Sequence, residues 1–368
     1  MLDNRLGVQF LFMAGETIPR VCPPEVLSSL IRAEITRDST GVDGFQLSFA
    51  VGANGGGVEV QSRVLDTLNR VWMGISTGGI PEVLLDGVIT QHDASPDPGS
   101  GGTVLTVTGR DVSLYMDLVE KNAPFENQSD SVIVGQILGR YSQVGFVPKV
   151  TSTGPAPSVN ERIPRQAESD YRYVQRLAQR NGFVFYVEPQ SFGVNEAYFG
   201  PDKRGGRHST LLWSTSPRRN VTSLRASLDG LAPIDVESFH LDLNAKQARK
   251  IPPTTENDPG LSASPLAAKR KVLLRSAASL PEGLVATTAA ALIARAAEPV
   301  GIDGSLDFVR YGEILRPRAI VDVQGAGPTY DGEYYVRRVT HVIEKGAYTQ
   351  NFTLGREGTG ARGKAGFG

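Results

Sequence analysis

The segment from Glu168 to Glu188 constrains the fold most, because it predicts a short amphipathic helix followed directly by a strand. Ser169 or Asp170 can cap this helix by accepting a hydrogen bond from a free backbone N–H at its N-terminus. Gly182 suits the left-handed position that ends a helix, and the aromatic and β-branched residues from Phe183 to Val187 favour a strand. The expected apolar face carries Tyr171, Val174, Leu177 and Ala178, and the polar face carries Arg172, Gln175, Arg176, Gln179 and Arg180. Taken alone, the pattern predicts an ordinary helix packed on a sheet.

The composition is typical of a folded protein with many strands and turns. A chain of 368 residues suggests two or three domains, and 41 glycines with 23 prolines favour an all-β fold with helical insertions. The sequence contains no apolar run long enough to cross a bilayer, so we expect no membrane insertion by this chain. The N-terminus lacks the features of a secretory signal, and we therefore expect the chain to fold in a cytoplasm.

Charge and cysteine content exclude several kinds of site. The formal net charge of −1 does not favour binding to nucleic acid, and the basic residues are spread along the chain rather than clustered in one motif. Cys22 is the only cysteine, which excludes an internal disulfide and any metal site built from several cysteines. We expect its thiol to be buried or neutral.

Alternating apolar residues predict strands in the first part of the chain. Apolar side chains alternate with polar ones from Phe45 to Val51, as in a half-buried strand. The Gly52–Gly57 stretch is expected to be a loop rather than a phosphate cradle, because β-branched alternation and not a helix follows it. A long polar loop is expected at Ala94–Gly102. Further strands are expected at Val8–Phe12, Val83–Thr90 and Thr103–Thr108.

After Asp111 the apolar spacing becomes helical and predicts a small α/β domain at 111–205. The segments Ser113–Phe125 and Ser129–Gln143 both show this spacing and lead into the helix and strand of the 168–188 segment. The polar stretch Pro201–Ser209 is expected to be a connector.

The last part of the chain predicts a second β-domain that is interrupted by a helical insertion at 245–302. Ser279 and Glu282 have the spacing of a capping box at the start of an alanine-rich helix, which Pro299 ends. The stretch Ile251–Pro265 is rich in proline and predicts a loop. Strands are expected at Leu211–Trp213, Val221–Leu228 and Ile234–Leu243, and again from Leu306 to Leu354.

A faint internal repeat is compatible with duplication of a β-domain. Asp86 and Gly87 begin a strand that runs to His92, and Asp331 and Gly332 begin another that runs to His341. Chance produces such an echo about as often as duplication does.

The sequence offers no motif for catalysis, metal binding or a cofactor. The histidines have no metal-ligand spacing, and there is no nucleophile elbow. Gly358–Lys364 has the spacing of a phosphate-binding loop, but Ala365 replaces the serine or threonine and no helix can follow, so a flexible tail is expected at 358–368. Paired carboxylates such as those of glycosidases leave no sequence signature and stay open. The four histidines are His92, His208, His240 and His341; the first and last are expected to be surface or interface side chains that form hydrogen bonds.

Three phrases of the sequence resemble the late control protein D family, the baseplate hub proteins of contractile phage tails and injection systems, which includes the hub portion of VgrG. The first phrase consists of Ser169, Asp170, Tyr171, Tyr173, Val174, Leu177, Ala178, Gly182 and Phe183. The second consists of Asp331, Gly332, Tyr334, Val336, Val339, His341, Tyr348 and Phe352. The third consists of Gly109, Arg110 and Asp111. Their order and spacing cover about nine tenths of the chain, which is more specific than any one phrase.

The resemblance implies a mainly β fold with α+β insertions, built from two tail-tube-like β-barrels, a small α/β domain and a helical insertion. The first barrel is expected at 1–110 and the second at 206–244 and 303–357. The implied function is that of a non-enzymatic baseplate hub: a homotrimeric ring that adapts the sixfold tail tube to the threefold central spike. Its implied partners are a tail tube or tube-initiator protein, a separate spike protein and a tape-measure protein. The implied location is the baseplate of a virion or injection particle, after assembly in a bacterial cytoplasm.

Two other functions remain open at this point. One is a tail-associated cell-wall hydrolase or carbohydrate-binding β-protein, and the other is a structural β-protein of another assembly. The strand register, which decides the side chains that face a lumen or a partner, cannot be read from one sequence.

Overall fold

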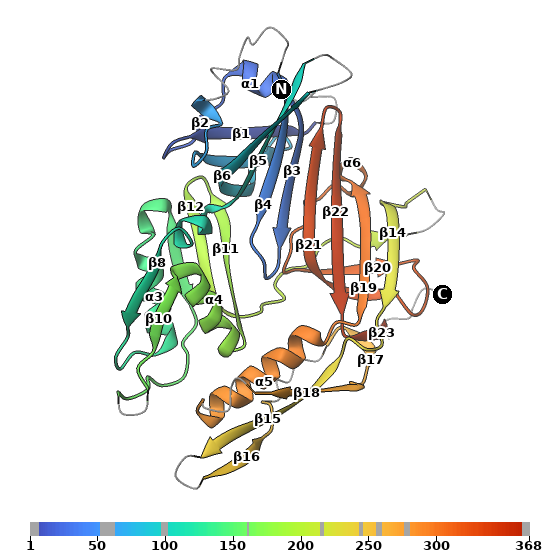
Figure 1. The fold of residues 1–368 in the computed structure, drawn as a ribbon. Coiled ribbons are helices and arrows are strands. Elements are labelled where there is room, and N and C mark those ends of the chain that lie inside the picture. Colours follow the sequence, from blue (N-terminus) through green and yellow to red (C-terminus); the bar gives the residue numbers. More distant parts are fainter. Residues whose placement is uncertain are drawn as a thin grey trace.

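The computed structural model shows a mainly β molecule, as the sequence predicts, and most of its strands belong to one 13-stranded sheet (Figure 1). It describes residues 7–51, 63–96, 102–159, 162–213, 217–242, 246–254, 260–275 and 280–362. None of the helices in these ranges is long and apolar enough to span a membrane.

The N-terminal strands form one part of this sheet. The expected strands are present, but the last strand but one extends to Pro96, so the loop predicted from Ala94 begins later. The predicted Gly52–Gly57 loop lies outside the described residues. The elements are β1 (Gln9–Gly15), β2 (Arg20–Val21), α1 (Pro24–Ser29), β3 (Leu30–Asp38), β4 (Gly44–Val51), β5 (Arg70–Ser76), β6 (Glu82–Pro96) and β7 (Thr103–Asp111).

A separate α/β region follows, with the predicted helix of the 168–188 segment at its centre. Its elements are η2 (Val112–Met116), β8 (Glu120–Pro124), α3 (Asp130–Gly139), η3 (Ser142–Val144), β9 (Phe146–Val150), β10 (Arg165–Ser169), α4 (Asp170–Arg180), β11 (Phe183–Ser191) and β12 (Val194–Pro201). The helical spacing of Ser113–Phe125 was misleading, because this segment forms a 3-10 turn and then β8, which pairs with β10.

One residue on each predicted face of α4 differs in burial from the expectation. Tyr173, Val174, Leu177 and Ala178 are buried, whereas Tyr171 is only partly buried. Arg180, expected on the polar face, is almost buried and forms an ion pair with Asp130 of α3. The α/β region therefore covers both sides of the helix.

The C-terminal strands complete the large sheet. They are β13 (Leu211–Leu212), β14 (Val221–Leu228), β19 (Val300–Asp307), β20 (Ile320–Gln324), β21 (Gly332–Glu344) and β22 (Ala347–Arg356), with the short helix α6 (Phe308–Tyr311) before β20. β21 pairs with β3 in antiparallel register from Arg338–Asp38 to Glu344–Arg32, so the strands of the two predicted barrels form one continuous sheet (Figure 1).

An insertion between β14 and β19 carries the predicted alanine-rich helix. It contains β15 (Ile234–Asp242), β16 (Gln247–Ile251), β17 (Ser262–Pro265), β18 (Arg270–Leu274) and α5 (Glu282–Ala296). β15 pairs with β16 and β18 under α5, rather than with the large sheet. α5 begins after Pro281 without a side-chain cap, and Ser279 lies outside the described residues.

The tail is ordered further than the sequence suggests. Gly358–Ala361 forms β23, which pairs with β17, because a Cβ at Gly358 would lie 2.1 Å from the carbonyl oxygen of Ser264 and only glycine permits this approach. The predicted flexible tail at 358–368 is thus wrong for its first residues.

Two parts of the large sheet repeat the same strand order. We call β3, β4, β5, β6 and β7 the first half, and β14, β19, β20, β21 and β22 the second half. Each set of five occurs in the same order along the chain, and its sheet order is β3-β4-β7-β6-β5 in one and β14-β19-β22-β21-β20 in the other. Each neighbouring pair is antiparallel in both halves.

Two register irregularities repeat as well and align the halves residue by residue, whereas the shift between β5 and β6 at Met73 and Gly74 has no counterpart between β20 and β21. The pairing shifts at Ile31 between β3 and β4, and at Thr222 between β14 and β19. It shifts again at Thr90 between β6 and β7, and at Arg337 between β21 and β22. Because a bulge is a specific feature of a fold, two bulges at matching places indicate that the halves are structural duplicates.

The sequence echo identified the right strands but the wrong residues. Matching the bulges aligns Val88 with Tyr335 and His92 with Val339, so His92 and His341 are not equivalent. The histidine that lies in the core is His341, which is 1% exposed and within 2.9 Å of the Tyr348 hydroxyl. The prediction that His341 is a surface or interface side chain is therefore wrong.

Burial of His341 predicts that this residue by itself makes the protein less stable in mild acid. Burial and the charges of Arg37 and Arg316 lower the pKa of His341 from 6.5 to about 3. Between these values the unfolded chain binds the extra proton, so the free energy of unfolding decreases as the pH falls, by up to about 1.4 kcal/mol per pH unit. Denaturant unfolding from pH 7.5 to 5 should show this slope reduced in His341→Gln.

The matched control is Tyr348→Phe, which removes the hydrogen-bond partner but keeps the histidine. It should be less stable at every pH by about 1 kcal/mol and retain the slope of the unsubstituted protein. Equal slopes in all three proteins would contradict a buried neutral His341.

Candidate functional site

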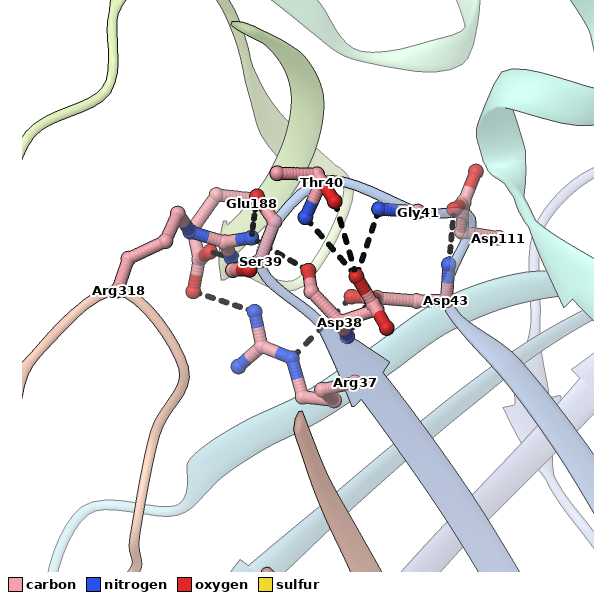
Figure 2. Close-up of polar contacts among 9 residues, drawn as sticks. All are labelled: Arg37, Asp38, Ser39, Thr40, Gly41, Asp43, Asp111, Glu188 and Arg318. Atoms are coloured by element: carbon pink, nitrogen blue, oxygen red, sulfur yellow. Dashed lines mark hydrogen bonds and ion pairs between the residues drawn. The ribbon is translucent and has the colours of Figure 1, made fainter. Parts of the chain in front are cut away.

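A buried cluster of charged residues joins three parts of the molecule at the turn between β3 and β4 (Figure 2). Arg37 is the last residue but one of β3, Glu188 lies on β11 of the α/β region, and Arg318 lies in the segment before β20 of the second half. We call this cluster the charged joint; it also includes Asp43 and Asp111, which lie next to the β3–β4 turn and at the end of β7.

Glu188 lies between the two arginines and pairs with both. Its Oε1 accepts a hydrogen bond of 2.5 Å from Arg37, and its Oε2 pairs with Arg318. Burial alone would raise the pKa of Glu188, but the two guanidinium groups outweigh it and lower that pKa to about 2. The carboxylate therefore stays charged over the whole physiological range.

Arg318 is held by more than its charge. Its guanidinium lies 3.9 Å from the centroid of the Tyr186 ring and donates a hydrogen bond of 2.8 Å to the carbonyl oxygen of Asp38. Its backbone has a positive φ of 66°. Arg318 therefore contacts both β3 and β11.

Asp43 and Asp111 connect the charged joint to the end of β7. The backbone N–H of Asp43 donates to the Asp111 carboxylate over 2.9 Å, and the Asp43 carboxylate accepts from Arg37 over 3.2 Å. Burial and the neighbouring Asp43 carboxylate raise the pKa of Asp111 to about 6, against the hydrogen bonds from Ser113. Burial also raises the pKa of Asp43.

A second buried ion pair ties the α/β region to the first half. Arg70 of β5 binds Asp86 of β6 in a two-pronged contact of 2.8 and 2.6 Å. Asn195 of β12 donates to Asp86 over 2.9 Å, and Arg70 donates to the Val144 carbonyl oxygen over 2.9 Å. The α/β region is thus attached at two separate places by groups that would be costly to leave unpaired.

One face of the large sheet is polar across both halves. Where β21 meets β3, Thr340 and Thr36 share a hydrogen bond of 2.9 Å, and Arg338 pairs with Asp38 over 2.9 Å. On the second half this face forms a shallow hollow of about 420 Å³, lined by Ser223, Arg225, Asp303, Ser305, Arg338, Thr340 and Thr353 among others. The first half continues the face with Arg32, Glu34, Gln46, Ser48, Thr106 and Thr108, none of which is buried.

The residues of the first sequence phrase lie in the α/β region, where they are structural. The Ser169 side chain caps α4 by accepting from the backbone N–H of Arg172 over 3.3 Å. Asp170 is fully buried and accepts hydrogen bonds of 2.7 Å from Tyr141 and Gln166. Gly182 has the predicted positive φ, 69°. Tyr173, Val174, Leu177 and Ala178 belong to the core of this region, against which Tyr171 and Phe183 pack.

The residues of the second phrase surround the β21–β22 hairpin. Asp331 accepts from the backbone N–H of Ala326 over 2.7 Å, and Gly332 has a φ of 125° that favours glycine. Arg356 lies over the Tyr334 ring, 4.3 Å from its centroid. Tyr334, Val336, Val339 and Phe352 belong to the core of the second half.

Sequence reasoning identified Asp111 but missed Arg37, Glu188 and Arg318. They lie far apart in the chain, and a lone arginine or glutamate on a strand has no local signature. In the described ranges, no group of three or more histidine, cysteine, aspartate or glutamate side chains could hold a metal ion. Cys22 is buried, and burial raises the pKa of its thiol to about 12.

Solved structures with the same fold come from tails and secretion machines. A tail protein from Neisseria meningitidis MC58 matches with a TM-score of 0.65 and 14% identity, over 94% of this chain and 96% of that one. The 43 kDa tail protein of prophage MuSo2 from Shewanella oneidensis matches with a TM-score of 0.66 and 12% identity, over 94% and 98%. An E. coli type VI secretion component, described as similar to the T4 tail proteins gp27 and gp5, matches with a TM-score of 0.55 and 15% identity, over 91% and 76%. At these identities the likeness concerns the fold.

The sequence itself matches one family model. No curated protein is significantly similar to the chain. The model described as the Alg8 N-terminal domain matches residues 77–345, a segment that begins directly after β5 and ends directly after β21. This description names neither a tail nor an activity. Because the match covers well over half of the chain, the chain belongs to the family described as the Alg8 N-terminal domain.

Proposed function

We propose that this protein is a structural hub subunit in the baseplate of a phage tail or contractile injection system, of the late control protein D type. The observation that carries the proposal is the likeness of fold over nearly the full length of two tail proteins. A shared domain alone would match only part of each chain, whereas here the order of all regions is common to both.

The duplicated halves support a homotrimer as the working form. Three copies contain six halves with the same strand order, and a cyclic trimer would present these six halves to a sixfold tail tube while it keeps threefold symmetry for a central spike. The proposed partners are therefore the tail tube or its initiator, a separate spike protein and a tape-measure protein. The proposed location is the baseplate of the particle, after assembly in a bacterial cytoplasm.

We assign the polar sheet face to the lumen of this ring. Threonine, serine and mixed charges cover it in both halves, so it presents no large apolar patch to which a passing cargo could adhere. The proposed role is structural rather than catalytic, because the polar groups that are buried in the charged joint pair with one another and do not line a cleft.

The α/β region has a positioning role in this proposal. The charged joint and the Arg70–Asp86 pair hold it rigidly against both halves, outside the sheet that would form the ring (Figure 1). The α/β domain at 111–205 and the first β-domain at 1–110 remain part of the proposal, whereas the insertion into the second β-domain begins with β15 at Ile234 and not at residue 245 as the sequence predicts.

The oligomeric state tests the proposal most directly. Light scattering after size exclusion should give three times the chain mass, and negative-stain images should show rings. A peptidoglycan zymogram should show no clearing. A strict monomer without rings that clears peptidoglycan would overturn the hub in favour of a cell-wall hydrolase.

The charged joint predicts that Glu188→Gln lowers the free energy of unfolding much more than the same substitution at Glu196. Glu188→Gln leaves two buried guanidinium groups without their shared carboxylate, so the free energy of unfolding should fall by about 3–5 kcal/mol. The matched control is Glu196→Gln. Glu196 lies opposite Glu188 in the same hairpin and pairs with Lys149, whose side chain is 55% exposed, so the loss should be about 1 kcal/mol or less.

Urea unfolding at neutral pH measures both losses. Similar losses in the two variants would show that the charged joint does not stabilise the attachment of the α/β region.

A further inference from the structure

The contact between the two halves of one chain uses two strand edges, one from each half. β21 is paired with β22 along one edge, and along the other edge with β20 up to Tyr335 and with β3 from Arg338 to Glu344. β3 supplies to this contact the edge that β4 does not use. The junction therefore joins the C-terminal part of β21, from Arg338 to Glu344, to the edge of β3 that β4 leaves free.

The equivalent edges of the duplicate strands have no partner among the described residues. β6, the counterpart of β21, pairs with β5 up to Val88, and beyond Ile89 that edge is unpaired as far as Pro96. β14, the counterpart of β3, pairs only with β19 and ends the sheet. The two open edges are separated in the sheet by β19, β22, β21, β3, β4 and β7, and within this chain they are not paired with each other.

The backbone segment that precedes the open edge of β6 has the same hydrogen bonds as the segment that precedes the paired edge of β21. Leu68 and Asn69 exchange backbone hydrogen bonds with Ile89 just before the open edge of β6. Arg318 and Ala319 exchange the matching bonds with Val336 just before β3 docks on β21. Leu68 and Arg318 share a positive φ, 67° and 66°. The backbone next to the open edge of β6 thus has the conformation that it has next to β21, where β3 is bound.

We propose that residues 91–96 of one copy pair in antiparallel register with β14 of the next copy, and so repeat between chains the junction that β21 and β3 form within one chain. The inference rests on the proposed trimeric hub and names the surface that builds it. Transfer of the β21–β3 register through the matched bulges places Asp93 opposite Ser227, Ala94 opposite Ala226 and Ser95 opposite Arg225.

The side chains of the two edges are complementary in this register. Leu224, Ala226 and Leu228 occupy the places that Ala33, Ile35 and Arg37 occupy on the inner face of β3, and Leu228 is 46% exposed in the single chain. Leu228 would meet His92, Ala226 would meet Ala94, and Leu224 would meet Pro96 from β6. On the polar face Asp93 lies diagonal to Arg225, within reach of a cross-strand ion pair. This pair would replace the Arg338–Asp38 and Thr340–Thr36 contacts of the junction within one chain.

A second copy is the partner that fits these edges best. The open edge of β6 is the duplicate of the β21 edge, the open edge of β14 is the duplicate of the β3 edge, and β21 and β3 pair with each other within one chain. The contact is head-to-tail, so it closes only when the rotation between halves repeats in a ring. Six halves from three chains supply such a ring, and closure pairs the open edges of β6 and β14 in every chain, so that neither edge can recruit further chains.

Cysteine cross-linking tests the register. Asp93→Cys with Ser227→Cys in one chain puts one thiol on each edge at positions that are directly opposite, where Cβ atoms are close enough for a disulfide. Oxidation of the purified protein should shift the band on a denaturing gel from one to three times the chain mass, in a ladder that stops at three. Buried Cys22 supplies no competing thiol.

The matched control is Asp93→Cys with Ser223→Cys, which carries the same number of thiols on the same strands but four residues out of register. It should stay at the mass of one chain. Equal cross-linking of the two pairs, or a ladder that continues beyond three copies, would overturn the proposed register and closure.

A second variant separates failure of this interface from failure of the hub proposal. Leu228→Lys places a charge on the inner side of the open edge and should convert trimers to folded monomers, with the circular dichroism spectrum unchanged. If the unsubstituted protein is trimeric but Leu228→Lys stays trimeric and the opposite cysteines do not react, this interface is wrong and the hub proposal stands. If the unsubstituted protein is monomeric at every concentration, both are wrong.

Discussion

The antiparallel pairing of β21 with β3 is the interaction on which the rest of the structure depends. It turns two duplicated sets of strands into one sheet, and it brings residues separated by about 300 positions into a regular ladder. Backbone hydrogen bonds supply the attachment, while the register is fixed by Thr36–Thr340 and by Asp38–Arg338. A shift of one residue would move Ile35 and His341 from the core to the polar face, so the register is strongly specified.

The charged joint lies at the end of this same ladder and extends it to the α/β region. Arg37 is the last inward-facing residue of β3, and its charge is balanced by Glu188 and Asp43 rather than by solvent. Arg318 reaches the same carboxylate from the second half. A buried charge without a partner would cost several kcal/mol, so the three regions depend on one another for their placement.

Duplication gives each half a strand edge of the kind that the other half uses in the β21–β3 contact. In the proposed trimer, the contact between chains repeats this contact within one chain. The fold is shared with tail proteins over nearly the whole chain, and the proposed hub uses this repeated contact to place six similar halves around three chains.

The sequence by itself determined the local elements. Ser169, Gly182 and the apolar spacing between them define α4, and alternation defines β4, because caps, turns and periodicity act over a few residues. The sequence did not show that Gly358 would pair with β17, that His341 is buried, or that β15 leaves the large sheet, since each depends on distant partners. Only the tertiary structure decided the register and brought Arg37, Glu188 and Arg318 together, because side chains on strands pair across space at distances that no local pattern encodes.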